Sequence, residues 1–541
     1  MRYLLPNWPQ TPQLLEEESM VNLAHLFDDH DQAFELVFLK PEPWLRHTFK
    51  ENWLLPQRWW SVFDAIQGIN IQTGQPVGLE DLDLPVDTER VFSQSQITFN
   101  REDRLYASVK AFPSGFITSV VLPNVQQGRT EERFYDDRGF LSYQITSDDE
   151  GHRLQCQWFN LAGSLVMTQN QAGAVTIAAE QLGRFKRAHY DNLDQVILEK
   201  VTQYFQIDQD PELIAMAGMN QTLLQYLMAH YPVTMLVEEH LSRQEQASVV
   251  ANGPQATHIV SPTDHFARYL QTKLSADVSA RIAVIPPYAT KLTLGTSNEA
   301  DQTILMWYVN RLPEARLAVV FPQLLQAMVK EERRRLLVIA DSDEQVQYLK
   351  QAASRFLAQQ EGVGFDSSTF VQIAAAIKQW EDAANQSDTP VENAQMPEPP
   401  APSPDERQLS DKALQQRQVA FQIFRMLTHI HYAVKPSVGQ MKTWLTSSRL
   451  LIDLGEQPNL LLQIGAISVA IPQINRRETG YVEDAINGRI IKEDRGLAEA
   501  LSDYLDALTV WNRAVVANVK RIDAHDDNQL MRLWKKVLTH D

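Results

Sequence analysis

The sequence predicts an α/β protein with two parallel-sheet lobes in series, an antiparallel β-domain inserted into the first lobe, and a C-terminal closing helix. Short apolar runs alternate with helix-compatible stretches, which is the rhythm of βαβ units. From about residue 91 to 185 the pattern changes to apolar–polar alternation punctuated by glycine turns. At 541 residues the chain is also too long for one hydrophobic core.

The first lobe is expected in two parts, 1–90 and 186–300. Its strand candidates are the runs "RYLLP", "FELVFL", "VTMLV", "THIVS" and "RIAVIPP". Each is a short apolar run next to a helix-compatible stretch, as buried parallel strands are. Between the first runs lies "NWLLPQRWWSVFDAIQG", which we expect to form a helix that buries the aromatic face of Trp53, Trp59, Trp60 and Phe63.

The inserted β-domain is expected at 91–185. Alternating apolar residues mark its strands, among them Leu105, Ala107, Val109 and Ala111, then Leu141, Tyr143 and Ile145, then Leu154, Cys156 and Trp158. Glycines at 139, 151, 163 and 173 separate these runs at near-regular intervals. Alternation with such turns is typical of an antiparallel meander with one face in water.

The second lobe is expected at 301–383 and 411–510. Its first strands are "TILMWYV" and "RLLVIADSDE", and the pattern resumes at "AFQIFRMLTHIHYAV". Six prolines fall between Pro390 and Pro404, so the segment 384–410 is expected to be an extended, disordered insertion. Apolar residues at helical spacing end the chain, and 511–541 is expected to be the closing helix.

Charge and cysteine content exclude several classes of protein. The formal net charge of −19 argues against nucleic-acid binding and against direct adsorption to an anionic membrane. The single cysteine, Cys156, excludes an internal disulfide and fits a reducing compartment. The sequence shows no secretory signal and no membrane-spanning run. We therefore expect a cytoplasmic protein that reaches the inner face of the membrane only through partners.

The two-lobe plan with a closing helix resembles GT-B glycosyltransferases, and three stretches carry local similarity. "THIVSPTDHF…RIAVIPPY" is similar to the end of the first lobe in retaining enzymes, and "VNRLPEARL" is similar to the opening of their second lobe. "AIPQIN…TGYVEDAINGRII" is similar to their Gly-x-Pro-Val and Asn-Gly region, and it contains Gln473 and Glu483. The resemblance implies a sugar-nucleotide cleft at these positions.

The acidic pair of that cleft is missing. Such enzymes carry two glutamates eight positions apart before the Gly-x-Pro turn, and these hold the ribose hydroxyls and the sugar through carboxylate hydrogen bonds. Counting back from Pro472, the positions hold Gln457 and Gly465, with Glu456 one place from the first. We therefore expect no catalytic residue and no cofactor.

Arginines of a diphosphate clamp are partly kept. Arg311 matches the arginine of the family's Gly-Arg-Leu, and Arg316 stands where the family has lysine. Basic residues at a strand end are also commonly solvated surface, and both interpretations stay open. His240 follows a buried strand where a residue of the first lobe would face the cleft, or it merely caps that strand. The histidines and aspartates of "HLFDDHD" are more typical of a charged helix turn than of a metal site, so no metal is expected.

Four long segments carry a more specific resemblance. They are "LRHTFKENWLLPQRWWSVFDAIQG", "FYDDRGFLSYQI…WFNLAGSLVM", "RLLIDLGEQPNLLLQIGAISVAIPQIN" and "YVEDAINGRIIKE…LSDYLDALTVWN". Together they resemble accessory Sec system protein one over nearly the whole chain. The departures are the insertion at 384–410 and Ala470, where the Gly-x-Pro turn usually has glycine. The resemblance implies a noncatalytic pseudo-glycosyltransferase that works with the second and third accessory secretion proteins.

Three hypotheses for function follow. The first, implied by the resemblance and by the missing glutamates, is an export adaptor that delivers serine-rich-repeat glycoprotein adhesins to the SecA2/SecY2 translocase of Gram-positive bacteria. The second is an active glycosyltransferase that modifies Ser/Thr-rich adhesins from a UDP-sugar, motivated by Arg311 and Arg316. The third is a structural scaffold that never contacts the cargo.

Overall fold

The structure is a computed structural model that divides into two compact units. It describes all residues except 9–14, 16–17, 55–57, 86, 94–95, 103, 113, 125–126, 209, 239–240, 294, 310–311, 363–418, 420–421, 424 and 539–541. The N-terminal unit comprises Met1–Pro262, Ala267–Pro287 and Trp534–Asp541, and the C-terminal unit comprises Thr263–Phe266 and Tyr288–Leu533. The expected insertion at 384–410 lies outside the described residues.

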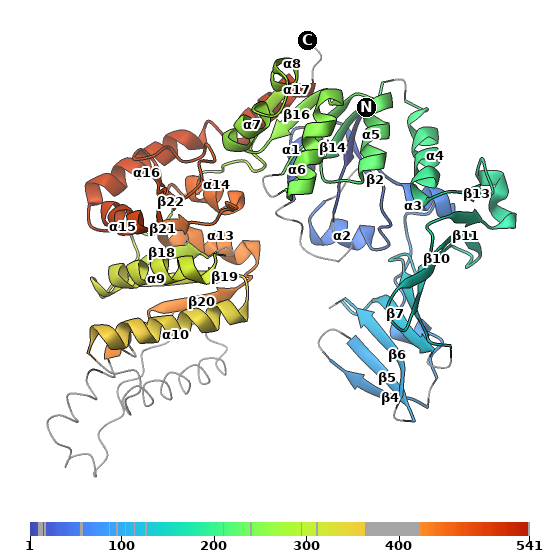
Figure 1. Cartoon of the computed structure of the whole chain (residues 1–541), viewed down its shortest axis with the longest axis horizontal. Helices are drawn as coiled ribbons and strands as arrows, with labels where there is room; N and C mark the ends of the chain where they lie inside the picture. The colour runs from blue at the N-terminus through green and yellow to red at the C-terminus, as the bar shows by residue number, and fades with distance from the viewer. Residues whose placement is uncertain are drawn as a thin grey trace. The chain divides into compact units, whose positions relative to one another are not determined.

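The N-terminal unit is built on a seven-stranded, all-parallel sheet (Figure 1). In spatial order its strands are β17 (Ile282–Val284), β16 (His258–Ser261), β15 (Val233–Leu236), β14 (Glu212–Met216), β1 (Arg2–Leu5), β2 (Phe34–Phe38) and β3 (Trp59–Ser61). The helices are α1 (Ser19–Asp29), α2 (Leu45–Glu51), α3 (Val62–Gln67), α4 (Leu193–Phe205), α5 (Gln221–His230), α6 (Arg243–Asn252), α8 (Ala276–Ser279) and α7 (Asp264–Gln271), of which the residues up to Phe266 belong to the C-terminal unit. The strand runs recognised in the sequence therefore form one doubly wound sheet.

A ten-stranded antiparallel sheet is inserted between β3 and β14. Its strands follow one another in chain order: β4 (Glu89–Phe92), β5 (Gln96–Arg101), β6 (Arg104–Ala111), β7 (Ile117–Asn124), β8 (Arg129–Tyr135), β9 (Leu141–Asp148), β10 (Arg153–Phe159), β11 (Leu165–Asn170), β12 (Val175–Ile177) and β13 (His189–Tyr190). Gly139, Gly151, Gly163 and Gly173 all have positive φ and make the turns. This is the antiparallel meander that the alternation predicts.

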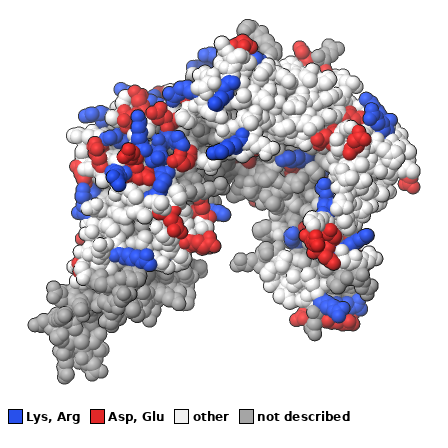
Figure 2. Space-filling model, in the orientation of Figure 1, with Lys and Arg blue, Asp and Glu red and all other residues white. Residues whose placement is uncertain are grey.

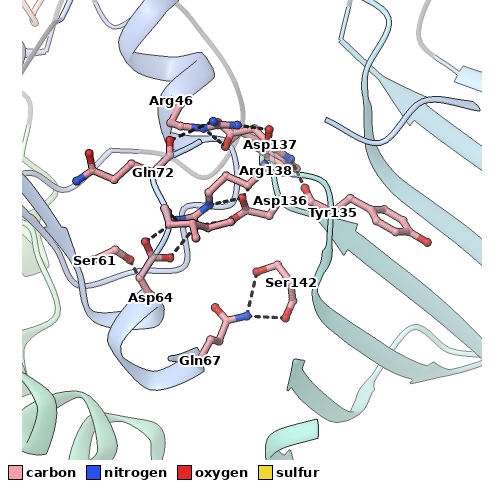
Figure 3. Close-up of polar contacts among 12 residues, drawn as sticks. Arg46, Ser61, Asp64, Gln67, Gln72, Tyr135, Asp136, Asp137, Arg138 and Ser142 are labelled. Carbon is pink, nitrogen blue, oxygen red and sulfur yellow. Dashed lines mark hydrogen bonds and ion pairs between the residues drawn. The ribbon is translucent and has the colours of Figure 1, made fainter. Parts of the chain in front are cut away.

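Buried ion pairs join this sheet to the parallel one (Figure 3). Arg138, in the β8–β9 turn, donates to Asp136 and to Asp64 of α3 at 2.7 Å each, and its side chain is only 5% exposed. Arg46 of α2 donates from Nε to Asp137 Oδ1 at 2.9 Å. Because each of these charges has a partner, the junction can stay dry without leaving an unpaired ion.

The expectation of an aromatic helix over "NWLLPQRWWSVFDAIQG" was wrong. Trp59 lies in strand β3, and only the residues after it form helix α3, in which Phe63 is buried. Trp53 follows the end of α2 with φ 54° and is 86% exposed. A strand of three residues that runs directly into a helix is too short to show a period in the sequence.

The C-terminal unit holds a six-stranded parallel sheet. In spatial order its strands are β20 (Ile430–Val434), β19 (Arg334–Ala340), β18 (Thr303–Tyr308), β21 (Ser448–Asp453), β22 (Gln473–Asn475) and β23 (Gly488–Ile490). The helices are α9 (Glu314–Val329), α10 (Asp343–Gln360), α13 (Val438–Ser447), α14 (Leu460–Ser468), α15 (Leu497–Leu505), α16 (Leu508–Ile522) and the first part of α17 (Asp527–Leu538), whose residues from Trp534 on belong to the N-terminal unit.

Alternate residues of the central strands enter two different cores, as expected for a sheet covered on both faces. Leu305 and Trp307 of β18 pack with α9, α10, α15 and α16. Met306 between them packs with α13 and α14 on the opposite face. The polar side chains therefore lie on the loops that follow the carboxyl ends of the strands.

Candidate functional site

The candidate site lies at the carboxyl ends of strands β18, β21, β22 and β23. In open α/β sheets, ligands bind outside this edge. Four segments meet here: the start of α9, the loop 454–459 after β21, residues 476–479 after β22, and the 3₁₀ turn Asp494–Gly496 after β23. All four belong to the C-terminal unit.

Arg316, in the first turns of α9, is held from three sides. Its Nε and Nη2 donate to the two carboxylate oxygens of Asp494 at 2.7 Å each. Nη2 also donates to the carbonyl of Leu454 at 2.9 Å, and Nη1 donates to Glu456 Oε1 at 3.3 Å. The fork-on-carboxylate geometry is the strong form of an arginine ion pair. The hydrogen bonds from Arg316 lower the pKa of Asp494, and those to Asp494 raise the pKa of Arg316.

Two further arginines complete an ion-pair network. Arg476 donates to Glu456 at 3.1 Å and to Asp494 at 3.2 Å, and Arg477 donates to the second oxygen of Glu456. Arg316 is 17% exposed, Arg476 26% and Glu456 52%, so the network runs from partly buried to exposed side chains. Three guanidinium groups thus share two carboxylates, which leaves a formal charge of about one positive unit.

A second, fully buried set of polar groups lies beneath this network. Asp453, at the end of β21 and 1% exposed, accepts hydrogen bonds from the amide of Asn459 at 2.8 Å and from Gln463 Nε2 at 2.9 Å. Burial raises the pKa of Asp453 to about 6 despite these donors. Gln473, with no exposed surface, donates to the carbonyl of Gln463 at 2.7 Å and accepts from Asn475 at 3.3 Å. Gln473 therefore positions loops and does not face solvent.

The two positions of the missing glutamate pair differ in environment. Gln457 is exposed on the loop after β21. Gly465 lies in the middle of α14, where an added Cβ would stand 2.9 Å from Leu445 Cδ1 of α13. The glycine therefore allows the two helices to pack closely, and any side chain at 465 must displace Leu445.

The remaining sequence candidates are scattered. Glu483 is exposed and paired with Arg521 of α16 at 2.7 Å. His240 and Arg311 lie outside the described residues. Of the candidates, the structure places Arg316 next to Glu456, the neighbour of Gln457, and it assigns Gln473 to the buried polar set.

Sequence reasoning missed Asp494, Arg476 and Arg477. A signal was available, since "NRRETG" directly follows β22 and "EDRG" follows β23, where charged side chains at strand carboxyl ends converge.

The described residues include neither a metal-binding cluster nor a membrane-spanning helix. No group of three or more His, Cys, Asp or Glu side chains among them is arranged to hold a metal ion. In the same part of the chain, no helix combines the length and apolar character that crossing a bilayer requires.

Comparisons with known proteins identify the family. Residues 4–396 and 407–541 match the family described as accessory Sec system protein one. The Staphylococcus aureus protein of that name is 23% identical over 560 residues, covering 98% of this chain and 97% of that protein.

Solved structures give the fold. A crystal structure of accessory secretory proteins 1, 2 and 3 from Streptococcus pneumoniae contains a chain with TM-score 0.74 and 20% identity, each chain covered to 99%. The pneumococcal O-GlcNAc transferase GtfA, crystallised with UDP and GlcNAc, has TM-score 0.65 and 12% identity, with 100% of this chain and 99% of that one covered. The GT-B-like α/β fold expected from the sequence is confirmed. This chain belongs to the accessory Sec system protein one family and has a role in accessory secretion.

Proposed function

We propose that this protein is a non-enzymatic subunit of an accessory Sec export complex, on a glycosyltransferase frame whose donor site has become an internal ion-pair network. The proposal rests on the ion pairs that Arg316 forms. The residue that the GT-B resemblance assigns to the diphosphate is held by two carboxylates of the same chain, Asp494 and Glu456.

The electrostatics oppose a nucleotide sugar. A diphosphate approaching Arg316 must either displace Asp494 or lie beside it as a like charge. Leaving a partly buried carboxylate without its donors costs about 1–3 kcal/mol, and more for a charged group. In addition, Gln457 and Gly465 offer no carboxylate for the ribose and sugar hydroxyls. A site whose arginine is already paired with Asp494, and which has no carboxylate at positions 457 and 465, should bind an activated sugar weakly.

The partners in this proposal are the second and third accessory secretion proteins. Support comes from the structure of similar fold, which is a complex of accessory secretory proteins 1, 2 and 3. We further propose that the complex of this chain with those two partners acts on the cytoplasmic side and delivers serine-rich-repeat glycoprotein adhesins to the SecA2/SecY2 translocase.

Co-purification tests the adaptor role. The chain is mixed with the purified second and third accessory proteins of its own organism and followed by size-exclusion chromatography with light scattering. We expect a stable hetero-oligomer. Persistence of the separate proteins at tens of micromolar would count against the proposal.

Export tests the cargo assignment. Deletion of the gene is expected to leave the adhesin inside the cell, and the wild-type chain is expected to restore its secretion. Normal adhesin secretion by the deletion strain would contradict a delivery role.

The competing function is an active glycosyltransferase, favoured by the three arginines at the strand ends and by the likeness in fold to the O-GlcNAc transferase. Calorimetry with UDP-GlcNAc separates the two. We expect no binding at up to millimolar ligand. Micromolar binding that is lost in Arg316→Ala, with adhesin glycosylation by the purified chain, would replace the adaptor proposal with the enzyme.

A further inference from the structure

Helix α16 (Leu508–Ile522) buries one face and leaves the other open. Trp511, Ala514, Asn518 and Ile522 recur at helical spacing and are buried, and the helix contacts α14 and α15 on that side (Figure 1). Asn518 fixes the helix, since its Nδ2 donates to the carbonyl of Ile471 at 2.9 Å and its Oδ1 accepts from Asn487. The opposite face consists of Leu508, Thr509, Asn512, Arg513, Val516, Val519 and Lys520, and we call it the α16 face.

The α16 face carries apolar side chains that contact little protein. Leu508 is 59% exposed, Val516 55% and Val519 38%. Scattered single apolar residues are normal at a surface, but three on one face of one helix form a stripe. An amphipathic stripe of this kind is what a partner covers in helix-mediated recognition.

The charge of the α16 face is one-sided. The helix contains no Asp or Glu along its 15 residues, although the chain carries 68 acidic against 49 basic residues. Arg513 and Lys520 form no ion pair with the described residues. Figure 2 shows basic and acidic side chains mixed over the part of the C-terminal unit that holds α15 and α16. The charged side chains that α16 itself contributes are all basic.

Neighbouring charges cancel only part of this bias: the exposed Asp523 directly follows the helix, and the other nearby acids are already paired. Glu483 and Asp484, on the loop beside α16, are paired with Arg521 at 2.7 Å and with Arg489 at 3.4 Å. Arg449 lies over the ring of Trp511 at 3.4 Å and donates to the amide oxygen of Asn298 at 2.7 Å, with no acidic partner among the described residues.

We propose that the α16 face docks another subunit of the accessory secretion complex through an acidic, partly apolar surface of that subunit. The inference rests on the proposed function and names the surface through which it operates. Valines and leucine supply apolar area, and Arg513 and Lys520 supply orientation and electrostatic steering toward an acidic partner.

The same features disfavour two other occupants. A membrane-surface helix uses bulky aromatic anchors and many cations, whereas the one aromatic residue of α16, Trp511, is buried. A symmetric contact with a second copy would bring Arg513 and Lys520 toward their own counterparts, which is repulsive. An acidic protein surface meets neither objection.

Substitutions on the α16 face test the proposal. The variants are Val516→Asp and the double change Arg513→Glu with Lys520→Glu, since all three side chains are exposed and α16 should still fold. Affinity for the purified second and third accessory proteins is measured by biolayer interferometry at low and high salt. We expect each variant to bind at least tenfold more weakly, and we expect salt to weaken the wild type more than the charge-reversed chain.

Matched controls lie elsewhere on the same unit. Val319→Asp introduces the same change on exposed α9, and Lys442→Glu reverses an exposed charge on α13. Both are expected to bind like the wild type, and circular dichroism checks that every variant is folded.

A photoreactive amino acid at position 516 identifies the occupant. Crosslinking to the second or third accessory protein supports the proposal. Three results would overturn it. The first is crosslinking only between copies of this chain, and the second is binding to phosphatidylglycerol vesicles that Arg513→Glu abolishes. The third is an unchanged affinity of both variants for the accessory proteins. If the wild-type chain itself fails to bind the accessory proteins, the proposed function fails; if the wild type and both variants bind alike, only this inference fails.

Discussion

Arg316 and Asp494 lie 178 residues apart in the chain and form a two-point ion pair, with Nε to Oδ2 and Nη2 to Oδ1 both at 2.7 Å. The pair joins the start of α9 to the turn after β23 at the edge where the sheet would present a ligand site. The arginine that the GT-B resemblance assigns to a diphosphate is thus already paired with a carboxylate of the same chain.

Removing the two acids should therefore restore anion binding. In Asp494→Asn with Glu456→Gln, three arginines lose their counter-charges, and we expect pyrophosphate or UDP to bind measurably where the wild type does not. Calorimetry at low salt makes the measurement. Asp523→Asn, which removes an exposed acid, is the control and should behave like the wild type. If neither variant binds pyrophosphate or UDP, the three arginines are not directed at a ligand.

The pH dependence of stability follows from the lowered pKa of Asp494. A carboxyl whose pKa is lower in the folded state stabilises the fold above its unfolded pKa, about 4, and loses that contribution as the pH falls through the folded value. The difference in urea midpoint between the wild type and Asp494→Asn should thus be largest near neutral pH and shrink below about pH 4. A difference that stays constant down to pH 3 would exclude an electrostatic origin.

Asp453 should behave in the opposite sense. Its pKa is raised to about 6 by burial, so its ionisation costs folding free energy once the pH rises through the range between about 4 and 6. Asp453→Asn removes that cost, but if its amide oxygen keeps the bonds from Asn459 and Gln463, its amide nitrogen stands against the backbone N–H of Gly455. We expect a net loss of about 1–3 kcal/mol at pH 5 that becomes smaller at pH 8. Chemical denaturation at the two pH values is the measurement, and a loss that grows with pH would be the contrary result.

Restoring the glutamate pair should not restore an enzyme. In Gln457→Glu with Gly465→Glu, the new side chain at 465 meets Leu445, whose Cδ1 would lie 2.9 Å from the added Cβ. We expect a loss of about 1–3 kcal/mol from overpacking and no hydrolysis of UDP-GlcNAc, because Arg316 stays paired. Gly465→Ala is the matched control for packing alone. Detectable turnover by the double variant would show that only the acids were missing.

Ala470 offers a stabilising change. It has φ 59°, a left-handed conformation that costs an L-residue about 1 kcal/mol and that glycine adopts freely. Related sequences are expected to carry glycine in this turn, and Ala470→Gly should raise the free energy of unfolding by a few tenths to about 1 kcal/mol. Differential scanning calorimetry would detect the higher melting temperature. Ala466→Gly, in the neighbouring helix α14, should instead destabilise.

Long periodic features of the fold could be predicted from the sequence because local patterns encode them. The run "TILMWYV" became β18 and "VTMLV" became β15, since an apolar run of that length has few alternatives to a buried strand. The alternation after residue 91 gave an antiparallel sheet because a sheet with one wet face needs it. The short strand that holds Trp59 was missed, since three residues are too few to show a period.

The kind of fold, and the position of Arg316 shortly after a buried strand, could be predicted from the sequence alone. The contacts of that arginine follow from the three-dimensional fold, because its partners come from loops 140 and 178 residues further along the chain. Strand order and register bring those loops together, and no local pattern records which charge will meet which. For the same reason, helical spacing predicts that α16 is amphipathic, while packing alone shows that its basic and apolar face is uncovered among the described residues.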